Sequence, residues 1–257
     1  VRRRGNLKVI TKATASRVLF ENGRASALVY SIAGKGGFCE AAGREIILCG
    51  GSINSPQLLM LSGIGPGAHL RQHGIEVQVD SPGVGGNLQD HLDLFVIAEC
   101  TGEHTYDKYA KPFWSAVAGL QYLLTRKGPV ASSLFETGGF WYADPTAASP
   151  DIQFHFGLGS GIEAGVEKLT NPGVTLNSAF LRPRSRGTVR LQTSNPTDAP
   201  LIDPNYWVDP YDREMSIKGL RLAREIMSQK ALKDWVMREV LPGPSLSSDD
   251  DLFDYAC

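Results

Sequence analysis

The stretch of residues 45–65, EIILCGGSINSPQLLMLSGIG, constrains the fold more than any other part of the chain. Residues 45–49 are mostly apolar and lack the alternation of a half-exposed strand, which predicts a strand buried on both faces. A glycine pair then breaks the strand. Ser52 or Ser55 can cap the helix that follows, and Pro56 suits its first position. The stretch therefore predicts a buried strand, a tight turn and a helix.

Gly50 and Gly51 lie where this strand meets the helix. Because they lack side chains, a ligand can come close to the backbone at this turn. The free N–H groups at a helix start also attract anions. The sequence thus predicts a ligand-binding crevice here, although a tight turn without a ligand is a structural alternative.

Residues 51–65, GSINSPQLLMLSGIG, resemble the second signature of the glucose-methanol-choline (GMC) flavin oxidoreductases over their whole length. Residues 87–91 (NLQDH) and 184–191 (RSRGTVRL) resemble further stretches of that family, closest to its choline dehydrogenase-like branch. The resemblance implies an FAD-dependent enzyme that transfers a hydride from the CH–OH group of a small alcohol to the flavin.

The family resemblance also implies that the chain is a fragment. The Gly-rich unit that cradles the FAD pyrophosphate is expected before Val1, and the catalytic His-Pro-x-Gly-Thr stretch after Cys257. We therefore expect this chain alone to be inactive and to lack the main catalytic histidine.

The resemblance further implies four cofactor-binding residues. The segment that includes Ala15 is expected to bring its backbone to the FAD adenine. Cys49, Gly50 and Gly51 are expected close to the adenosine portion. These roles are implied by the family and do not follow from spacing alone.

Three residues are expected at the substrate. Alternation over residues 152–158 places His155 on the open face of its strand, and the resemblance implies that its ring supports the alcohol oxygen. Glu136 is expected to share a strand face with Phe140 and Tyr142, an arrangement that suits a quaternary ammonium group. A surface histidine and a salt-bridged carboxylate at the rim are the structural alternatives.

The predicted fold class is α+β. Asn22-Gly23 predicts a hairpin turn within residues 16–32. Strands and then helices follow, which predicts an antiparallel sheet with helices on one face. The strands are expected at 136–142, 152–158, 174–181 and 188–192, and the helices at 111–127, 212–229 and 232–239. We expect residues 1–90 to form part of an FAD-binding domain and residues 91–257 to form a substrate-binding domain that lacks its C-terminal continuation.

Composition narrows the partners. With 26 basic and 27 acidic residues, the chain has no bulk charge to hold nucleic acid, and no apolar run approaches the length of a membrane span. The four cysteines lack metal-type spacing and suggest reduced thiols in a cytoplasmic protein. His69 and His73 lack a third metal ligand nearby, so we expect two solvated histidines and no metal. The oligomeric state stays open.

Two other functions remain compatible with the sequence. The GMC scaffold also hosts lyases that split cyanohydrins, in which the flavin does no redox work. A non-enzymatic module that uses the antiparallel sheet as a binding platform is the second alternative.

Overall fold

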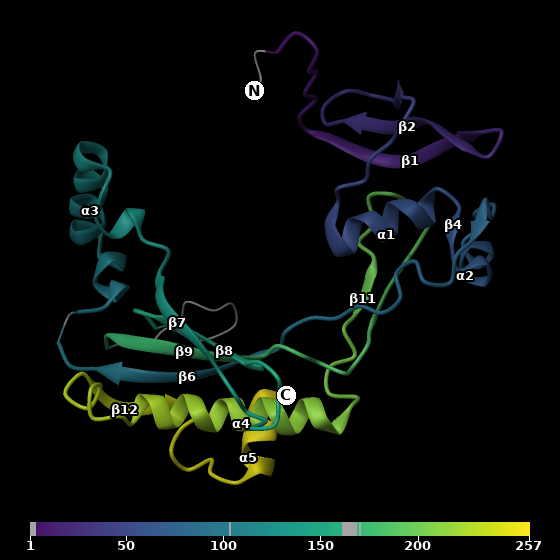
Figure 1. Ribbon diagram of the computed structural model, residues 1–257. Coiled ribbons are helices and arrows are strands. Elements are labelled where there is room, and N and C mark those ends of the chain that lie inside the picture. Colours follow the sequence, from purple (N-terminus) through teal and green to yellow (C-terminus); the bar gives the residue numbers. More distant parts are fainter. Residues whose placement is uncertain (1–3, 103, 161–168, 170) are drawn as a thin grey trace. The chain divides into compact units, whose positions relative to one another are not determined.

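The computed structural model describes residues 4–102, 104–160, 169 and 171–257. The chain divides into two compact units (Figure 1). The first comprises Val1–Gln89 and Arg186–Asn205, and the second comprises Asp90–Ser185 and Tyr206–Cys257. Residues 186–205, which the sequence analysis assigned to the second domain, thus belong to the first unit.

The first unit begins with a three-stranded antiparallel ribbon of β1 (Ala13–Glu21), β2 (Arg24–Ile32) and β3 (Cys39–Ala42). Asn22 and Gly23 join β1 to β2, and both have positive φ angles, of 51° and 76°. Positive φ at both central residues matches the right-handed twist of paired strands. The predicted hairpin is therefore confirmed.

The helix predicted after the glycine pair is confirmed as α1 (Gly51–Leu61), but it begins earlier than expected, so that Pro56 lies inside it. The strand predicted at residues 45–49 is wrong. This segment pairs with no strand in the described part of the chain, Ile47 is 80% exposed, and Cys49 is exposed. A strand exists through hydrogen bonds to its neighbours, and apolar residues alone cannot supply them.

The rest of the first unit packs around the buried side chains of Met60, Leu70 and Leu191. It contains β4 (Ile64–Gly65), α2 (Gly67–Gln72), β5 (Val79–Asp80), β10 (Thr188–Arg190) and β11 (Leu201–Asp203). His69 on α2 is not simply solvated, because its Nε2 accepts a hydrogen bond from the Leu191 N–H at 3.0 Å.

The second unit is built on a five-stranded antiparallel sheet with the order β12-β6-β9-β8-β7. The predicted antiparallel sheet is confirmed, except that the strand predicted at 188–192 pairs with residues 201–203 in a separate two-stranded sheet of the first unit. Its strands are β6 (Asp93–Cys100), β7 (Phe135–Trp141), β8 (Ile152–Gly157), β9 (Gly173–Phe180) and β12 (Val236–Leu241).

Helices α4 (Pro210–Met227) and α5 (Asp249–Ala256) lie on one side of this sheet (Figure 1). The apolar stripe of α4 packs on β6 and β9, and this contact forms the main hydrophobic core. The helix predicted at residues 232–239 is wrong, since turns lead there into β12. Edge pairing with β6 and an ion pair of 2.7 Å between Arg238 Nε and Glu99 Oε2 favour the strand.

A third helix, α3 (Pro112–Thr125), confirms the helix predicted at 111–127. It is flanked by the short 3-10 helices η1 (Tyr106–Ala110) and η2 (Pro129–Ala131), on which it packs. Several of its apolar side chains are exposed, among them Leu124 at 76%. No helix in the described residues is long and apolar enough to cross a membrane.

Candidate cofactor and substrate sites

A cavity of about 440 Å³ in the first unit brings together three of the four predicted cofactor residues. Ala15 on β1 lies on its wall with Cys49 and Gly50, which precede α1. Gly51, the fourth, follows directly and has a φ of 76°, a conformation that favours glycine. The fold thus brings residues far apart in the sequence to one cavity, whose wall also includes Leu28, Leu58 and Pro196.

The start of α1 suits a ligand that approaches the backbone. A Cβ atom added to Gly50 would lie 3.1 Å from Asn54 Cβ, so a larger residue would crowd the turn. The Gly50 N–H donates to Ser55 Oγ at 3.0 Å, which fixes the entry to the helix. No side chain caps the helix and no acidic residue lies in its first turn. The start of α1 therefore presents bare backbone to a ligand in the cavity.

His155 lies on β8, half-buried, with its ring centroid 6.0 Å from that of Phe135. Its neighbour Phe154 is buried in the core beneath the sheet, so His155 points to the opposite face, as alternation predicts. The residue opposite His155 on β7 is Gly138, which has no side chain to fill the space beside the imidazole.

Sequence reasoning missed a polar pair beside His155. Asn177 is the register partner of His155 on β9 and is almost completely buried. Its Nδ2 donates to Asp93 Oδ2 at 3.3 Å, while Asp93 Oδ1 is buried without a hydrogen-bond partner in the described residues. Only the register of three strands brings these residues together, and no local motif indicates it.

Glu136 has different partners from those expected. The β7–β8 register shifts between Phe135 and Thr137, which interrupts the alternation at Glu136. Its Oε1 accepts hydrogen bonds from Ser132 Oγ, at 2.6 Å, and from the Tyr106 hydroxyl. These bonds, the one from Ser132 first, lower the pKa of the Glu136 carboxyl below its usual value.

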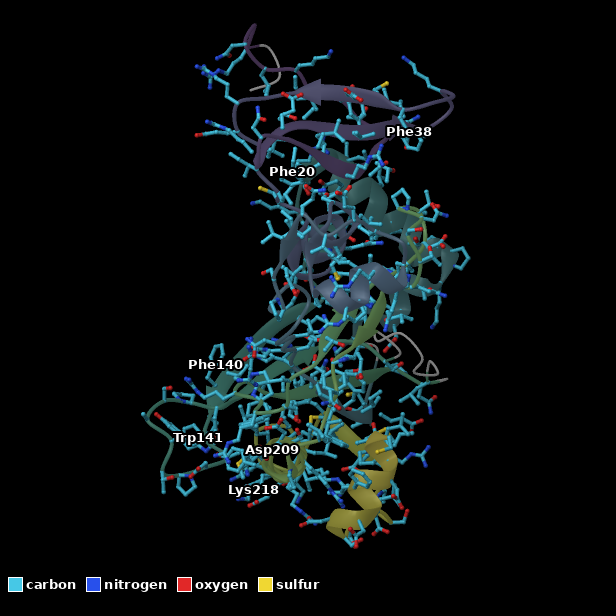
Figure 2. The ribbon with its side chains drawn as sticks, turned by 90° about the vertical axis from the view of Figure 1, so that its right-hand side faces the viewer. Phe20, Phe38, Phe140, Trp141, Asp209 and Lys218 are labelled. Carbon is cyan, nitrogen blue, oxygen red and sulfur yellow. The ribbon has the colours of Figure 1, made fainter. Side chains whose placement is uncertain are left out.

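Phe140, the predicted aromatic neighbour of Glu136, lies further along β7 opposite Gln153 and is 57% exposed. Figure 2 labels it beside Trp141, the last residue of the same strand. The rings near Glu136 are instead those of Tyr106 and Tyr109, which line a cavity of about 800 Å³ with it. Alternation along one strand could not predict these neighbours, because the Glu136 carboxyl meets residues from η1 and from the end of η2.

The charges around this cavity do not single out a cationic ligand. Lys108, Arg126 and Lys127 line it together with Glu136. The Lys108 ammonium already lies 5.1 Å from the centre of the Tyr109 ring. A quaternary ammonium group would therefore compete with a resident cation for the same aromatic surface.

Comparison with known proteins identifies the family. Models of the GMC oxidoreductase family match residues 1–93 and residues 183–257. The chain belongs to the GMC oxidoreductase family. It is 38% identical over 251 residues to the alcohol dehydrogenase (acceptor) of Pseudomonas putida, and the aligned region covers 97% of this chain and 46% of that protein. It is 39% identical over 249 residues to the mitochondrial choline dehydrogenase of Homo sapiens, which covers 97% of this chain and 42% of that protein.

Solved structures give the same assignment. A crystal structure of formate oxidase matches with a TM-score of 0.90 and 25% identity, covering 100% of this chain and 50% of that one. Pyridoxine 4-oxidase from Mesorbium loti matches with a TM-score of 0.82 and 27% identity, covering 99% and 46%. The homologues are FAD-dependent oxidoreductases, as predicted, and the chain spans about half their length or less. These relatives lend no support to the lyase alternative.

Proposed function

We propose that this chain is part of an FAD-dependent dehydrogenase or oxidase that acts on the CH–OH group of a small alcohol. The observation that carries the proposal is the cavity at the start of α1. Ala15, Cys49 and Gly50, the residues expected at the adenosine of FAD, all line this cavity. The chain belongs to a family of flavoproteins. We propose residues 1–90, together with residues 186–205 of the same unit, as part of the FAD-binding domain, and the rest of residues 91–257 as the substrate-binding domain.

When bound, FAD would supply the hydride acceptor for the alcohol carbon. The residues of this chain would contribute binding and orientation. The bare backbone of Gly50 and Gly51 would admit the adenosine, with Cys49 and Ala15 on the wall of its cavity. His155 would donate a hydrogen bond to the alcohol oxygen and stabilise the negative charge that develops there as the hydroxyl proton passes to the main catalytic histidine that the family resemblance implies.

Glu136 would bind a polar or positively charged group at the other end of the alcohol, and Phe140 would supply an apolar contact. The relatives include enzymes named for choline and for other alcohols. The mixture of charges around Glu136 is compatible with both. We therefore propose the reaction and leave the alcohol to experiment.

The cofactor site can be tested in a protein of the relatives' length that carries this chain, prepared without its flavin. Titration with FAD, followed by quenching of the flavin fluorescence, should show binding that Gly50→Val abolishes, since the new side chain would crowd Asn54 and Ser55. Gly36→Val is the matched control, because a Cβ atom at Gly36 meets nothing within 4 Å. Equal affinity of both variants for FAD would contradict the proposed adenosine site.

The reaction requires a protein of the relatives' length that carries this chain. Primary alcohols added without oxygen should bleach its flavin absorption, and His155→Ala should slow the bleaching about 100-fold or more. Failure of every alcohol to reduce a bound flavin, together with cleavage of cyanohydrins, would favour the lyase. A protein that binds no flavin would favour the non-enzymatic module.

A further inference from the structure

Helix α3 packs mainly on the two short 3-10 helices at its ends, which connect it to the sheet of the second unit. Residues 106–132 leave the sheet region after β6 and return before β7, and α3 packs on η1 and η2. The Lys108 ammonium of η1 lies 5.7 Å from the centre of the Trp114 ring on α3. The position of α3 relative to the sheet therefore depends on the contacts that hold η1 and η2 in place.

The 3-10 helix η1 is held to the sheet by hydrogen bonds to the backbone of the sheet strands and their ends. The Tyr106 N–H donates to the Leu158 carbonyl oxygen at 2.6 Å, just beyond the end of β8. Asp107 Oδ2 accepts from the Gly173 N–H at 2.9 Å and from the Ser160 N–H at 3.2 Å. Asp107 thus links η1 to the start of β9.

The segments of η1 and η2 both donate a hydrogen bond to one carboxylate oxygen, Glu136 Oε1. Ser132 directly follows η2, and its hydroxyl donates to Glu136 Oε1 at 2.6 Å. The Tyr106 hydroxyl, from η1, donates to the same oxygen. Glu136 lies on β7, so a single side chain joins both ends of the α3 segment to the sheet.

We propose that Tyr106, Glu136 and Ser132 form a clamp that holds the two ends of the α3 segment together and fixes the width of the cavity beside it. Tyr106 and Ser132 are positioning residues in this scheme. The clamp is independent of the proposed reaction, since it needs neither FAD nor substrate. It is also compatible with a substrate contact at Glu136, because both donors use Oε1, and Oε2 has no hydrogen-bond partner in the described residues.

The same residues explain why the clamp matters for the cavity. Tyr106 comes from η1, Ser132 from the end of η2, and Arg126 and Lys127 from the end of α3, and all of them line the cavity with Glu136. Separation of η1 from η2 would move opposite walls apart. A change at Tyr106 or Ser132 should therefore alter the cavity without removing the Glu136 carboxylate.

Limited digestion with trypsin tests the clamp in this chain. Arg126 and Lys127 are exposed cleavage sites at the C-terminal end of α3, and Arg126 already has a φ of 55°. The double variant Tyr106→Phe with Ser132→Ala should be cut there about two- to fivefold faster, the range expected for exposed polar contacts. Glu136→Ala should be cut faster by a similar factor. The single variant Ser132→Thr, which keeps the hydroxyl, should be cut at the rate of the unmodified chain.

Tyr206→Phe is the matched control, because Tyr206 donates to Asp90 Oδ2 at 2.7 Å and forms another tyrosine–carboxylate pair in the same unit. It should leave cleavage at Arg126 unchanged, and circular dichroism should show that all variants remain folded. Unchanged cleavage in both the double variant and Glu136→Ala would overturn the clamp. An equal increase in the cleavage rate of Tyr206→Phe would also overturn it. If the double variant or Glu136→Ala does not fold, the single variant Tyr106→Phe takes its place, and unchanged cleavage in that variant would overturn the clamp.

Discussion

The substitution Leu220→Ala tests where the core of the second unit lies. Leu220 on α4 is completely buried between the helix and the sheet. The helix already lies close to the sheet here, since a Cβ atom added at Gly219 would come within 3.0 Å of Ile152 Cδ1. This close approach limits how far the helix can move toward the sheet to fill the space left by the missing isopropyl group. We expect a loss of about 3–4 kcal/mol, in the range of fully buried leucines.

Urea unfolding followed by tryptophan fluorescence measures this loss. All four tryptophans of the chain lie in the second unit, so their emission reports on that unit alone. Trp207 is a direct probe, because its indole N–H donates to Ser216 Oγ on α4 at 3.1 Å. With a slope of about 1–3 kcal/mol per molar urea, the midpoint should fall by about 1–4 M.

Leu124→Ala on α3 provides the matched control. The same atoms are removed from a side chain that is 76% exposed, so the expected change is within about 0.5 kcal/mol. If Leu124→Ala cost as much as Leu220→Ala, α3 would be packed against another surface. A cost below about 1 kcal/mol for Leu220→Ala would refute the assignment of the core to the α4–sheet contact.

Three further predictions concern titration and capping. Burial raises the pKa of the Cys100 thiol to about 11, so iodoacetamide should alkylate it at neutral pH only after urea unfolding, as mass spectrometry can show. Ser248 closes a capping box at the start of α5, so Ser248→Ala should cost about 1 kcal/mol in the urea assay. The hydrogen bond from Arg238 lowers the pKa of Glu99 below 4.5. The ionised Glu99 carboxylate therefore stabilises the fold above pH 4.5, and this stabilisation is lost as the pH falls through the lower pKa of the folded state. Glu99→Gln removes the titrating group, so the urea midpoint should fall less steeply on the acid side.

Features that depend on neighbouring residues could be predicted from the sequence. The hairpin at Asn22-Gly23 follows from the conformational freedom of those two residues. Helix α3 follows from its apolar spacing between Pro112 and Gly128, and the orientation of His155 follows from alternation along β8. The family and its flavin chemistry were also indicated by the sequence, because residues 51–65 form one continuous motif.

The remaining features depend on partners far along the chain. Residues 45–49 have the composition of a buried strand, but in the described chain no strand pairs with them. Residues 236–241 became β12 because β6 offers an edge. The neighbours of Glu136 differ from those expected because Tyr106 and Ser132, from outside β7, donate hydrogen bonds to its carboxyl. The sequence by itself determined local conformation and family. The tertiary structure alone decided which strands pair and what each side chain meets, since hydrogen bonds between distant segments form only when the whole unit folds.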